Sequence, residues 1–265
     1  MDNAPVDCPA GKIIDYAGAS DAAHCRDCPP GYYCDNVATE LKLKICNSGQ
    51  KCGFGESTVA GSGDCTAGTY CPVGERELPC TAGSYCSTTQ LTAPEGQCTE
   101  GYYCPEGAQS ATQTDCPQGS YCPPGSSEPT PCPPGTFSNS LNLIQLQDCT
   151  TCTAAQHCKG RGLTAPTNEC EQGFYCPAGS VSKYENLCST GNFCAADQPD
   201  QTPCPVNQYQ GAQGQVSCLT CPDRYTCENT GLDEPDICPV GYYCPAGAAK
   251  VQCPAGTYNP RKGAK

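Results

Sequence analysis

Residues 98–122 read CTEGYYCPEGAQSATQTDCPQGSYC and contain two copies of a pattern that runs through the whole chain. In each copy two cysteines lie six residues apart, and the segment between them reads x-x-Gly-x-Tyr. The usual step from one copy to the next is 18 residues. Such self-similarity at a short period indicates one small unit repeated along the chain. The eleven copies begin at the cysteines numbered 28, 46, 65, 80, 98, 116, 152, 170, 188, 221 and 238.

The composition favours crosslinks over a hydrophobic core. The 29 cysteines are about 11% of the chain, above the ~8–10% typical of secreted disulfide scaffolds. The chain also has no Trp, one Met and four Phe, too little to bury a broad core. A disulfide that closes a loop of roughly 15 residues contributes on the order of 3 kcal/mol. We therefore expect an extracellular or cell-surface protein that a reducing cytosol would unfold.

Three longer loops interrupt the short units. They run from Cys8 to Cys25, from Cys132 to Cys149 and from Cys204 to Cys218, and these six cysteines are candidate structural disulfides. Each long loop ends in a Cys-x-x-Cys pair. This organisation predicts one block over 1–131 with six short units, a second over 132–203 with three, and a third over 204–252 with two. Residues 253–265 begin a further, truncated block.

The motif residues predict the fold class. Glycine at the third position after the first cysteine permits a positive φ, and the aromatic residue before the second cysteine can cover a disulfide. Ala155 and Arg224 replace this glycine, and we expect their turns to differ. Alternating apolar residues over 39–46 predict a half-buried strand. We predict small disulfide-rich repeats in an elongated linear array of short β-hairpins and turns, with little or no helix and no single hydrophobic core.

The spacing leaves the disulfide connectivity open. If each long loop closes on itself, the cysteines between the loops number twelve, six and four, which are all even. One scheme interlocks pairs of units by first-to-third and second-to-fourth bridges. Another joins the second cysteine of each unit to the first of the next, as in Cys34 to Cys46 and Cys52 to Cys65.

The two ends of the chain, its apolar runs and its net charge indicate the kind of protein to which it belongs. The odd cysteine count and the unit opened by Cys253 indicate a fragment in which Cys253 is bridged beyond Lys265; the alternative is a free or intermolecular thiol. The first residues lack the character of a secretory signal, so a signal would lie upstream or have been removed. No apolar run is long enough to span a membrane. The net charge of −13 argues against nucleic acid as a partner.

The runs CPAGA (244–248), CPAGTY (253–258) and CPPGTF (132–137) resemble the ephrin-receptor-like cysteine-rich repeat. They are similar, more distantly, to the cysteine-rich modules of tumour-necrosis-factor receptors. The resemblance implies a secreted, rod-like, disulfide-linked architecture. Long arrays of such repeats in single-celled eukaryotes occur in surface proteins and in extracellular appendages resembling flagellar hairs (mastigonemes).

No residues form a convincing catalytic, cofactor or metal site. The Cys-x-x-Cys pairs lie among cysteines that already have disulfide spacing, which disfavours zinc and redox chemistry. His24 and His157 adjoin cysteines but are expected to be ordinary structural residues. Thr167-Asn168-Glu169-Cys170 has too few acidic ligands for a calcium site. We expect no enzyme, no cofactor and no bound metal.

Two kinds of surface segment are candidate contact or modification sites. The segment 141–148 is the most apolar in the chain, and packs either within its own loop or against another chain through Leu141, Leu143, Ile144 and Leu146. Stretches rich in Ser, Thr and Pro are typical of O-linked glycan acceptors. The candidate acceptors are Ser126, Ser127, Thr130, Thr164 and Thr167.

The sequence favours a non-enzymatic structural subunit of an extracellular filament, flagellar-hair-like appendage or surface coat, built as a disulfide-stapled rod. Its partners would be other copies of itself or other filament and coat proteins, together with glycans. The alternative is the ligand-binding or spacer ectodomain of a cell-surface receptor or adhesion protein.

Overall fold

The computed structural model describes residues 7–14, 21–35 and 43–263. It divides into two compact units, one formed by residues 1–130 and 140–148 and the other by residues 131–139 and 149–265. The finer division into blocks at 132, 204 and 253 stays a prediction. None of the helices in the described residues is long and apolar enough to cross a membrane.

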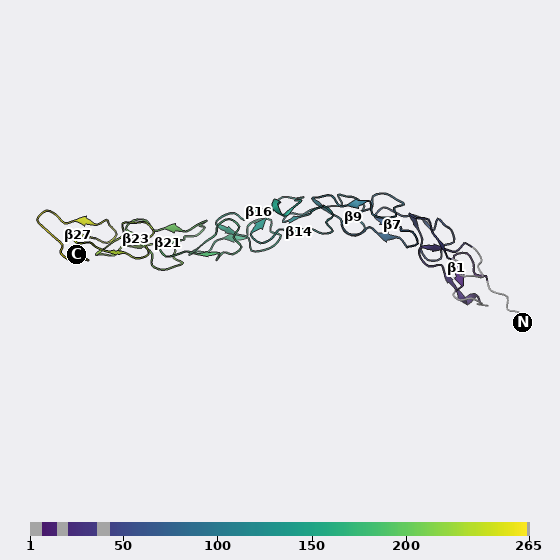
Figure 1. The fold of residues 1–265 in the computed structure, drawn as a ribbon, viewed down its shortest axis with the longest axis horizontal. Coiled ribbons are helices and arrows are strands. Elements are labelled where there is room, and N and C mark those ends of the chain that lie inside the picture. The colour runs from purple at the N-terminus through teal and green to yellow at the C-terminus, as the bar shows by residue number, and fades with distance from the viewer. Residues whose placement is uncertain (1–6, 15–20, 36–42, 264–265) are drawn as a thin grey trace. The chain divides into compact units, whose positions relative to one another are not determined.

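The residues that the structure describes form fourteen two-stranded hairpins, each made of strands that are consecutive in the sequence. Within each compact unit the hairpins follow one another in chain order (Figure 1). Helix is limited in the described residues to two short 3-10 turns, η1 (Ala22–His24) and η2 (Leu146–Asp148). The predicted fold class of small disulfide-rich repeats with almost no helix is therefore confirmed.

The hairpin strands are nearly all two residues long. In the first compact unit and at its border the pairs are β1 (Lys12–Ile14) with β2 (Cys25–Asp27), β3 (Tyr32–Tyr33) with β4 (Lys44–Ile45), β5 (Gln50–Lys51) with β6 (Gly63–Asp64), β7 (Thr69–Tyr70) with β8 (Leu78–Pro79), β9 (Ser84–Tyr85) with β10 (Gly96–Gln97), β11 (Tyr102–Tyr103) with β12 (Thr114–Asp115), and β13 (Ser120–Tyr121) with β14 (Thr130–Pro131).

The second compact unit repeats this arrangement. Its pairs are β15 (Thr136–Phe137) with β16 (Thr150–Thr151), β17 (Gln156–His157) with β18 (Asn168–Glu169), β19 (Phe174–Tyr175) with β20 (Asn186–Leu187), β21 (Asn192–Phe193) with β22 (Thr202–Pro203), β23 (Gln208–Tyr209) with β24 (Leu219–Thr220), β25 (Tyr225–Thr226) with β26 (Asp236–Ile237), and β27 (Tyr242–Tyr243) with β28 (Val251–Gln252).

Each short repeat closes on itself. In the Cys65 repeat, named here by its first cysteine, the amide of Thr69 donates to the carbonyl of Thr66, and Gly68 takes φ 88°. This turn brings Cys65 and Cys71 to a Cα–Cα distance of 6.1 Å, well within the range that a disulfide spans. All eleven short repeats are bridged between the first cysteine and the second, six residues on.

Both connectivity schemes considered for the short repeats are therefore wrong. The physical reason is the tight turn at the motif glycine, which places the nearest sulfur partner inside the repeat. A six-residue loop restricts the unfolded chain less than a longer one and contributes about 2 kcal/mol. Neighbouring short repeats are not covalently crosslinked to each other and need another means of attachment.

Backbone hydrogen bonds supply that attachment. We call the third residue after the first cysteine the turn residue. The loop residue is the left-handed residue three or four positions after the second cysteine of a short repeat, or after the residue six positions beyond the first cysteine in a long repeat. The junction between the Cys80 and Cys98 repeats is representative of those within each compact unit. Its four bonds run from Gly83 N–H to Cys104 O (2.8 Å), from Cys98 N–H to Gly83 O (2.9 Å), from Cys86 N–H to Ala108 O (3.0 Å) and from Gly107 N–H to Cys80 O (2.8 Å).

The turn residue also contacts the repeat after next. A Cβ added to Gly68 would lie 2.7 Å from the carbonyl oxygen of Gly107, which is the loop residue two repeats further on. The same close approach occurs between Gly101 and Asn142, at 2.9 Å. Glycine is needed at these positions both for its positive φ and for the space that a side chain would occupy.

Ala155 and Arg224 do not have different turns, so that prediction is wrong. Both take the same positive φ as the glycines, 70° and 76°. Their amides donate to the second cysteines of the next repeats, Cys176 and Cys244, as the glycine amides do. The junction bonds therefore impose the left-handed backbone even on residues with a side chain.

The buried interior is made of cystines. Among the buried hydrophobic residues that the structure describes, every one except Ile14 and Ala108 is a cysteine. Aromatic rings lie half-buried beside them, as Tyr85 and Tyr102 do against Cys98 and Cys104. The absence of a single hydrophobic core is thus a property of the described residues, as the composition predicts.

The predicted half-buried strand over 39–46 is only partly described, because residues 36–42 lie outside the described residues. Its described part is β4, in which Ile45 is 52% exposed, and Leu43 beside it is also exposed. The half-buried face is therefore wrong for these two residues. A two-stranded hairpin has no second sheet layer to cover it.

Candidate functional site: the cavity at Glu169 and Asp197

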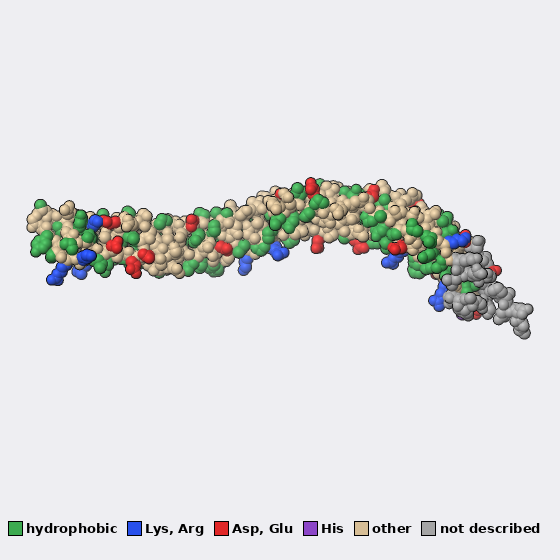
Figure 2. Space-filling model, viewed as in Figure 1, with side chains coloured by type: hydrophobic (Ala, Val, Ile, Leu, Met, Phe, Trp, Pro, Cys, Tyr) green, Lys and Arg blue, Asp and Glu red, His purple; other side chains and the backbone are tan. Residues whose placement is uncertain are grey.

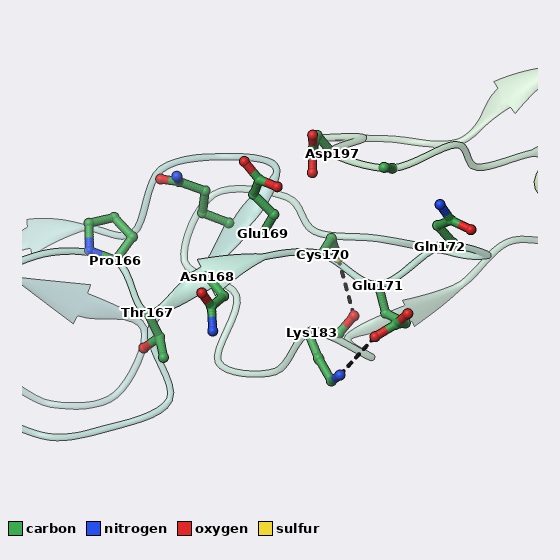
Figure 3. A pocket seen from close by; sticks show the side chains of 11 residues that line it. Pro166, Thr167, Asn168, Glu169, Cys170, Glu171, Gln172, Lys183 and Asp197 are labelled. Carbon is green, nitrogen blue, oxygen red and sulfur yellow. Dashed lines mark hydrogen bonds and ion pairs between the residues drawn. The ribbon is translucent and has the colours of Figure 1, made fainter.

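A polar cavity of about 770 Å³ opens on the second compact unit, lined by residues of the Cys152, Cys170 and Cys188 repeats. Figure 3 shows its walls, with Glu169 and Asp197 on one side and the Glu171–Lys183 pair on another. No aromatic side chain lines it. The lining residues are Gln156, Pro166, Thr167, Asn168, Glu169, Cys170, Glu171, Gln172, Lys183, Ala196 and Asp197.

Two chain segments bring the acidic residues together. Glu169 ends β18 and pairs in register with Gln156 of β17. Asp197 is the loop residue of the Cys188 repeat and takes φ 61°. In most other repeats the loop residue is glycine. This glycine lies against the residue that comes just before the first cysteine of the preceding repeat, as Gly179 lies against Thr151. The aspartate therefore places its side chain beside Glu169.

The acidic side chains at the cavity have different partners. Lys183 Nζ lies 2.7 Å from Glu171 Oε2, and this hydrogen bond raises the pKa of Lys183. Glu169 instead shares a hydrogen bond with Asp197, and this bond and the like charge raise the pKa of Glu169 above its ordinary value. The lysine at the cavity is thus engaged by Glu171, while Glu169 faces another acid.

This chemistry suits proton sharing between carboxyl groups and the hydrogen bonding of polar ligands. Cys170 in the wall is bridged to Cys176 and is therefore no thiol nucleophile. The described residues contain no group of three or more His, Cys, Asp or Glu side chains arranged to hold a metal ion. The run 167–170, which has too few acidic ligands for calcium, contains β18 and forms part of the cavity wall.

The six cysteines of the long loops form three disulfides, Cys8–Cys25, Cys132–Cys149 and Cys204–Cys218. Each Cys-x-x-Cys pair divides its cysteines between a long-loop bridge and the next short repeat. In the long repeats the place of the second cysteine is taken by buried Ile14, Ser138 and Gln210. Asn259 holds the same place after Cys253, because Gly241 donates to its carbonyl, and Cys253 is the free cysteine among the described residues.

The apolar segment 141–148 splits into a packed and an exposed part. Leu143 forms a bridge to Tyr121 and accepts a hydrogen bond from the amide of Cys122, so it acts as part of a junction. Ile144 is half-buried. Leu141 and Leu146 are 56% and 45% exposed. Local packing thus engages one half of the segment, and an inter-chain role for it stays a prediction.

The candidate glycan acceptors and the two histidines differ in how far they are exposed to solvent. Ser127, Thr130, Thr164 and Thr167 are exposed, whereas the hydroxyl of Ser126 donates to the carbonyl of Pro123. His24 lies in η1 and is half-buried. His157 occupies the aromatic position of its repeat and is buried, and within the described residues its Nδ1 has no hydrogen-bond partner.

Sequence reasoning missed the pairing of Glu169 with Asp197. The signal lay in the segment after the second cysteine, where most repeats carry glycine at the position that Asp197 occupies. Aligning the repeats over their full length, and not only between the two cysteines, would have singled out this residue. Its meeting with Glu169 requires the junction geometry, which spacing alone does not supply.

No family model matches the chain. It is similar to the Sushi, von Willebrand factor type A, EGF and pentraxin domain-containing protein 1 of Mus musculus, at 29% identity over 142 residues. The Rattus norvegicus protein of the same name is 26% identical over 142 residues. Each match covers 50% of this chain and 4% of the relative, so the chain spans a small part of these relatives' length. Together with the disulfides, this similarity supports a cysteine-rich repeat array of the extracellular kind.

Proposed function

We propose that the chain is a non-catalytic structural element of an extracellular filament, flagellar-hair-like appendage or surface coat. The supporting observation is the junction: within each compact unit the turn residue of a repeat hydrogen-bonds to the next repeat and touches the one after it. Within each compact unit, repeats joined in this way resist bending at any one step. The resemblance of its CPAG runs to ephrin-receptor-like repeats agrees with a scaffold of this type.

Surface chemistry supports a structural role. On the face shown in Figure 2 acidic side chains are dispersed over each compact unit and are not gathered into one patch. Exposed apolar side chains recur in the second compact unit, at Leu187, Leu219, Ile237 and Val251. Repeated apolar contacts of this kind suit association with other copies or coat proteins, and the exposed Ser and Thr residues suit O-linked glycans.

Electron microscopy of native material tests this proposal. We expect ordered fibres or a surface layer with a fixed axial repeat, labelled by an antibody against this chain. Purified protein should form the same repeat as its concentration rises. Isolated particles at every concentration, together with an unlabelled surface, would contradict the structural proposal.

A second candidate is a spacer ectodomain of a receptor or adhesion protein. The observation in its favour is the similarity to relatives whose name describes several domain types, in which the matched segment is 4% of the length. Surface labelling followed by detergent extraction of the natural protein distinguishes the two. Release by detergent alone supports the ectodomain, and retention in an insoluble fibre supports the filament.

A further inference from the structure

Among the repeats whose loop residue the structure describes, three have a residue other than glycine at that position, and these three share one geometry. Gln90, Asn142 and Asp197 all take left-handed backbone conformations, with φ between 60° and 64°. The side chain of each meets the acidic residue that immediately precedes the first cysteine of the preceding repeat. The pairs are Asn142 with Asp115, Gln90 with Asp64, and Asp197 with Glu169; the last two side chains line one cavity together (Figure 3).

In two of these pairs the loop residue supplies an amide donor. Asn142 Nδ2 donates to Asp115 Oδ1 at 3.0 Å. The hydrogen bond from Gln90 lowers the pKa of Asp64. Both contacts are complete when the carboxyl group is ionised, because an ionised carboxylate only accepts hydrogen bonds.

The third pair lacks that donor. Two ionised carboxylates have no hydrogen to share, so the contact between Glu169 and Asp197 forms only when one of them holds a proton. The other charged groups nearby do not supply the missing charge: Lys183 is bonded to Glu171, and Gln156 lies opposite Glu169 in the hairpin. His157, the next residue of β17, is buried.

We propose that Glu169 and Asp197 form a proton-operated clasp between β18, the strand that leads into the Cys170 repeat, and the loop of the Cys188 repeat, closed in acid and released at neutral pH. The raised pKa of Glu169 sets the sign. Its contribution to the junction is fully present below the ordinary value of 4.5 and is lost as the pH rises through the raised value. The cavity beside the pair gives the loop room to move when the carboxylates separate.

One backbone amide reports on the clasp. The amide of Cys176 donates to the carbonyl of Gln198, the residue after Asp197, at 3.1 Å. The matched reporter is the amide of Cys122, which donates at 2.8 Å to Leu143, the residue after Asn142. Hydrogen exchange of the intact, oxidised chain is measured from pH 7 to pH 4 and corrected for the intrinsic rate.

We expect the protection factor of the Cys176 amide to rise on acidification, by up to about tenfold per pH unit within the titration range. The Cys122 amide should show no such rise. D197N restores the amide donor found at Asn142 and should make protection at Cys176 independent of pH. N142D creates a second acid pair with Asp115 and should transfer the acid-dependent rise to Cys122.

Two results would overturn the clasp. One is protection at Cys176 that stays flat or falls with acid in the wild-type chain. The other is a rise with acid that persists unchanged in both D197N and E169Q. The third arm is the addition of millimolar calcium chloride at pH 7. If it protects the Cys176 amide as strongly as acid does, the pair is a cation site and not a proton clasp. If it has no effect on this amide, the result supports the clasp.

Discussion

At the residue scale, the turn glycine has two separate duties. Its positive φ closes the six-residue loop, and its missing side chain admits the carbonyl of the repeat after next. Ala155 and Arg224 show that the first duty can be met by other residues. No residue with a side chain can leave this space free where the two repeats lie as close as at Gly68. A Cβ there would meet the carbonyl oxygen of Gly107, which is a backbone atom and cannot rotate away.

A matched pair of substitutions separates these duties. Gly68 and Gly241 have similar φ, 88° and 83°, but a Cβ added to Gly241 meets nothing within 4 Å. We expect G241A to cost about 1–2 kcal/mol for the left-handed backbone alone. G68A should cost at least about 2 kcal/mol more, because of overpacking against the Gly107 carbonyl.

Hydrogen exchange at the two amides that donate to these glycines, those of Cys80 and Cys253, measures the local costs. Equal loss of protection in the two variants would show that contact with the repeat after next contributes nothing.

Residue-level prediction succeeded for the glycines and failed for their replacements. Positive φ follows from the absence of a Cβ, so the motif alone predicts it. That Ala155 and Arg224 adopt the same turn depends on the junction bonds to Cys176 and Cys244, which lie in the next repeats and have no signature in the motif.

At the element scale, the repeat is a closed cystine loop attached to its neighbours by hydrogen bonds. Hairpins of two-residue strands are not stable alone in water. The local disulfide contributes about 2 kcal/mol, and each backbone bond of a junction adds about 0.5–1.5 kcal/mol. Stability is therefore shared between neighbours, as in other repeat proteins.

Proteolysis between two repeats tests this arrangement. Arg161 is exposed in the loop that connects the Cys158 end of one repeat to the Cys170 start of the next. After limited trypsin digestion, molecules cut only in this loop should separate into two fragments on denaturation without reductant, because no disulfide crosses this loop.

The control variant carries both R161Q and K159Q, because trypsin would otherwise still cut this loop after Lys159. Fragments that stay joined until a reductant is added would show that bridges cross between repeats, as the scheme that bonds Cys158 to Cys170 requires.

The hairpins and the long-loop spacing could be predicted from the sequence, but the short bridges could not. An even number of cysteines can be paired completely either within repeats or between them, so the count does not distinguish the two arrangements. The choice depends on the turn that brings Cys65 and Cys71 to 6.1 Å, a three-dimensional fact. The cavity pair likewise depends on the junction, which joins Glu169 to a residue 28 positions further on.

At the scale of the whole molecule, acid should have opposite effects at different junctions. The hydrogen bonds from Lys44 and Gln90 lower the pKa values of Asp35 and Asp64. Such groups add stability above their unfolded pKa of about 4, and this is lost as the pH falls through their lower folded values.

We therefore expect the amide of Cys71, which donates to the residue after Gln90, to lose protection below about pH 4. The amide of Cys176 should gain protection over the range above it. Hydrogen exchange of the whole chain across this pH range measures both amides together. A uniform response of all junctions would contradict the local assignments.

The interior of the whole molecule is made of cystines, since only Ile14 and Ala108 join the cysteines among the buried hydrophobic residues described. Hydrogen exchange of the native chain, measured before and after reduction with a phosphine at constant pH, shows whether these cystines hold the repeats in shape. We expect the junction amides of Cys80, Cys98 and Cys116, each protected by a turn glycine carbonyl in the oxidised chain, to exchange at unfolded-chain rates once the thiols are free. Protection that survives complete reduction would contradict this expectation.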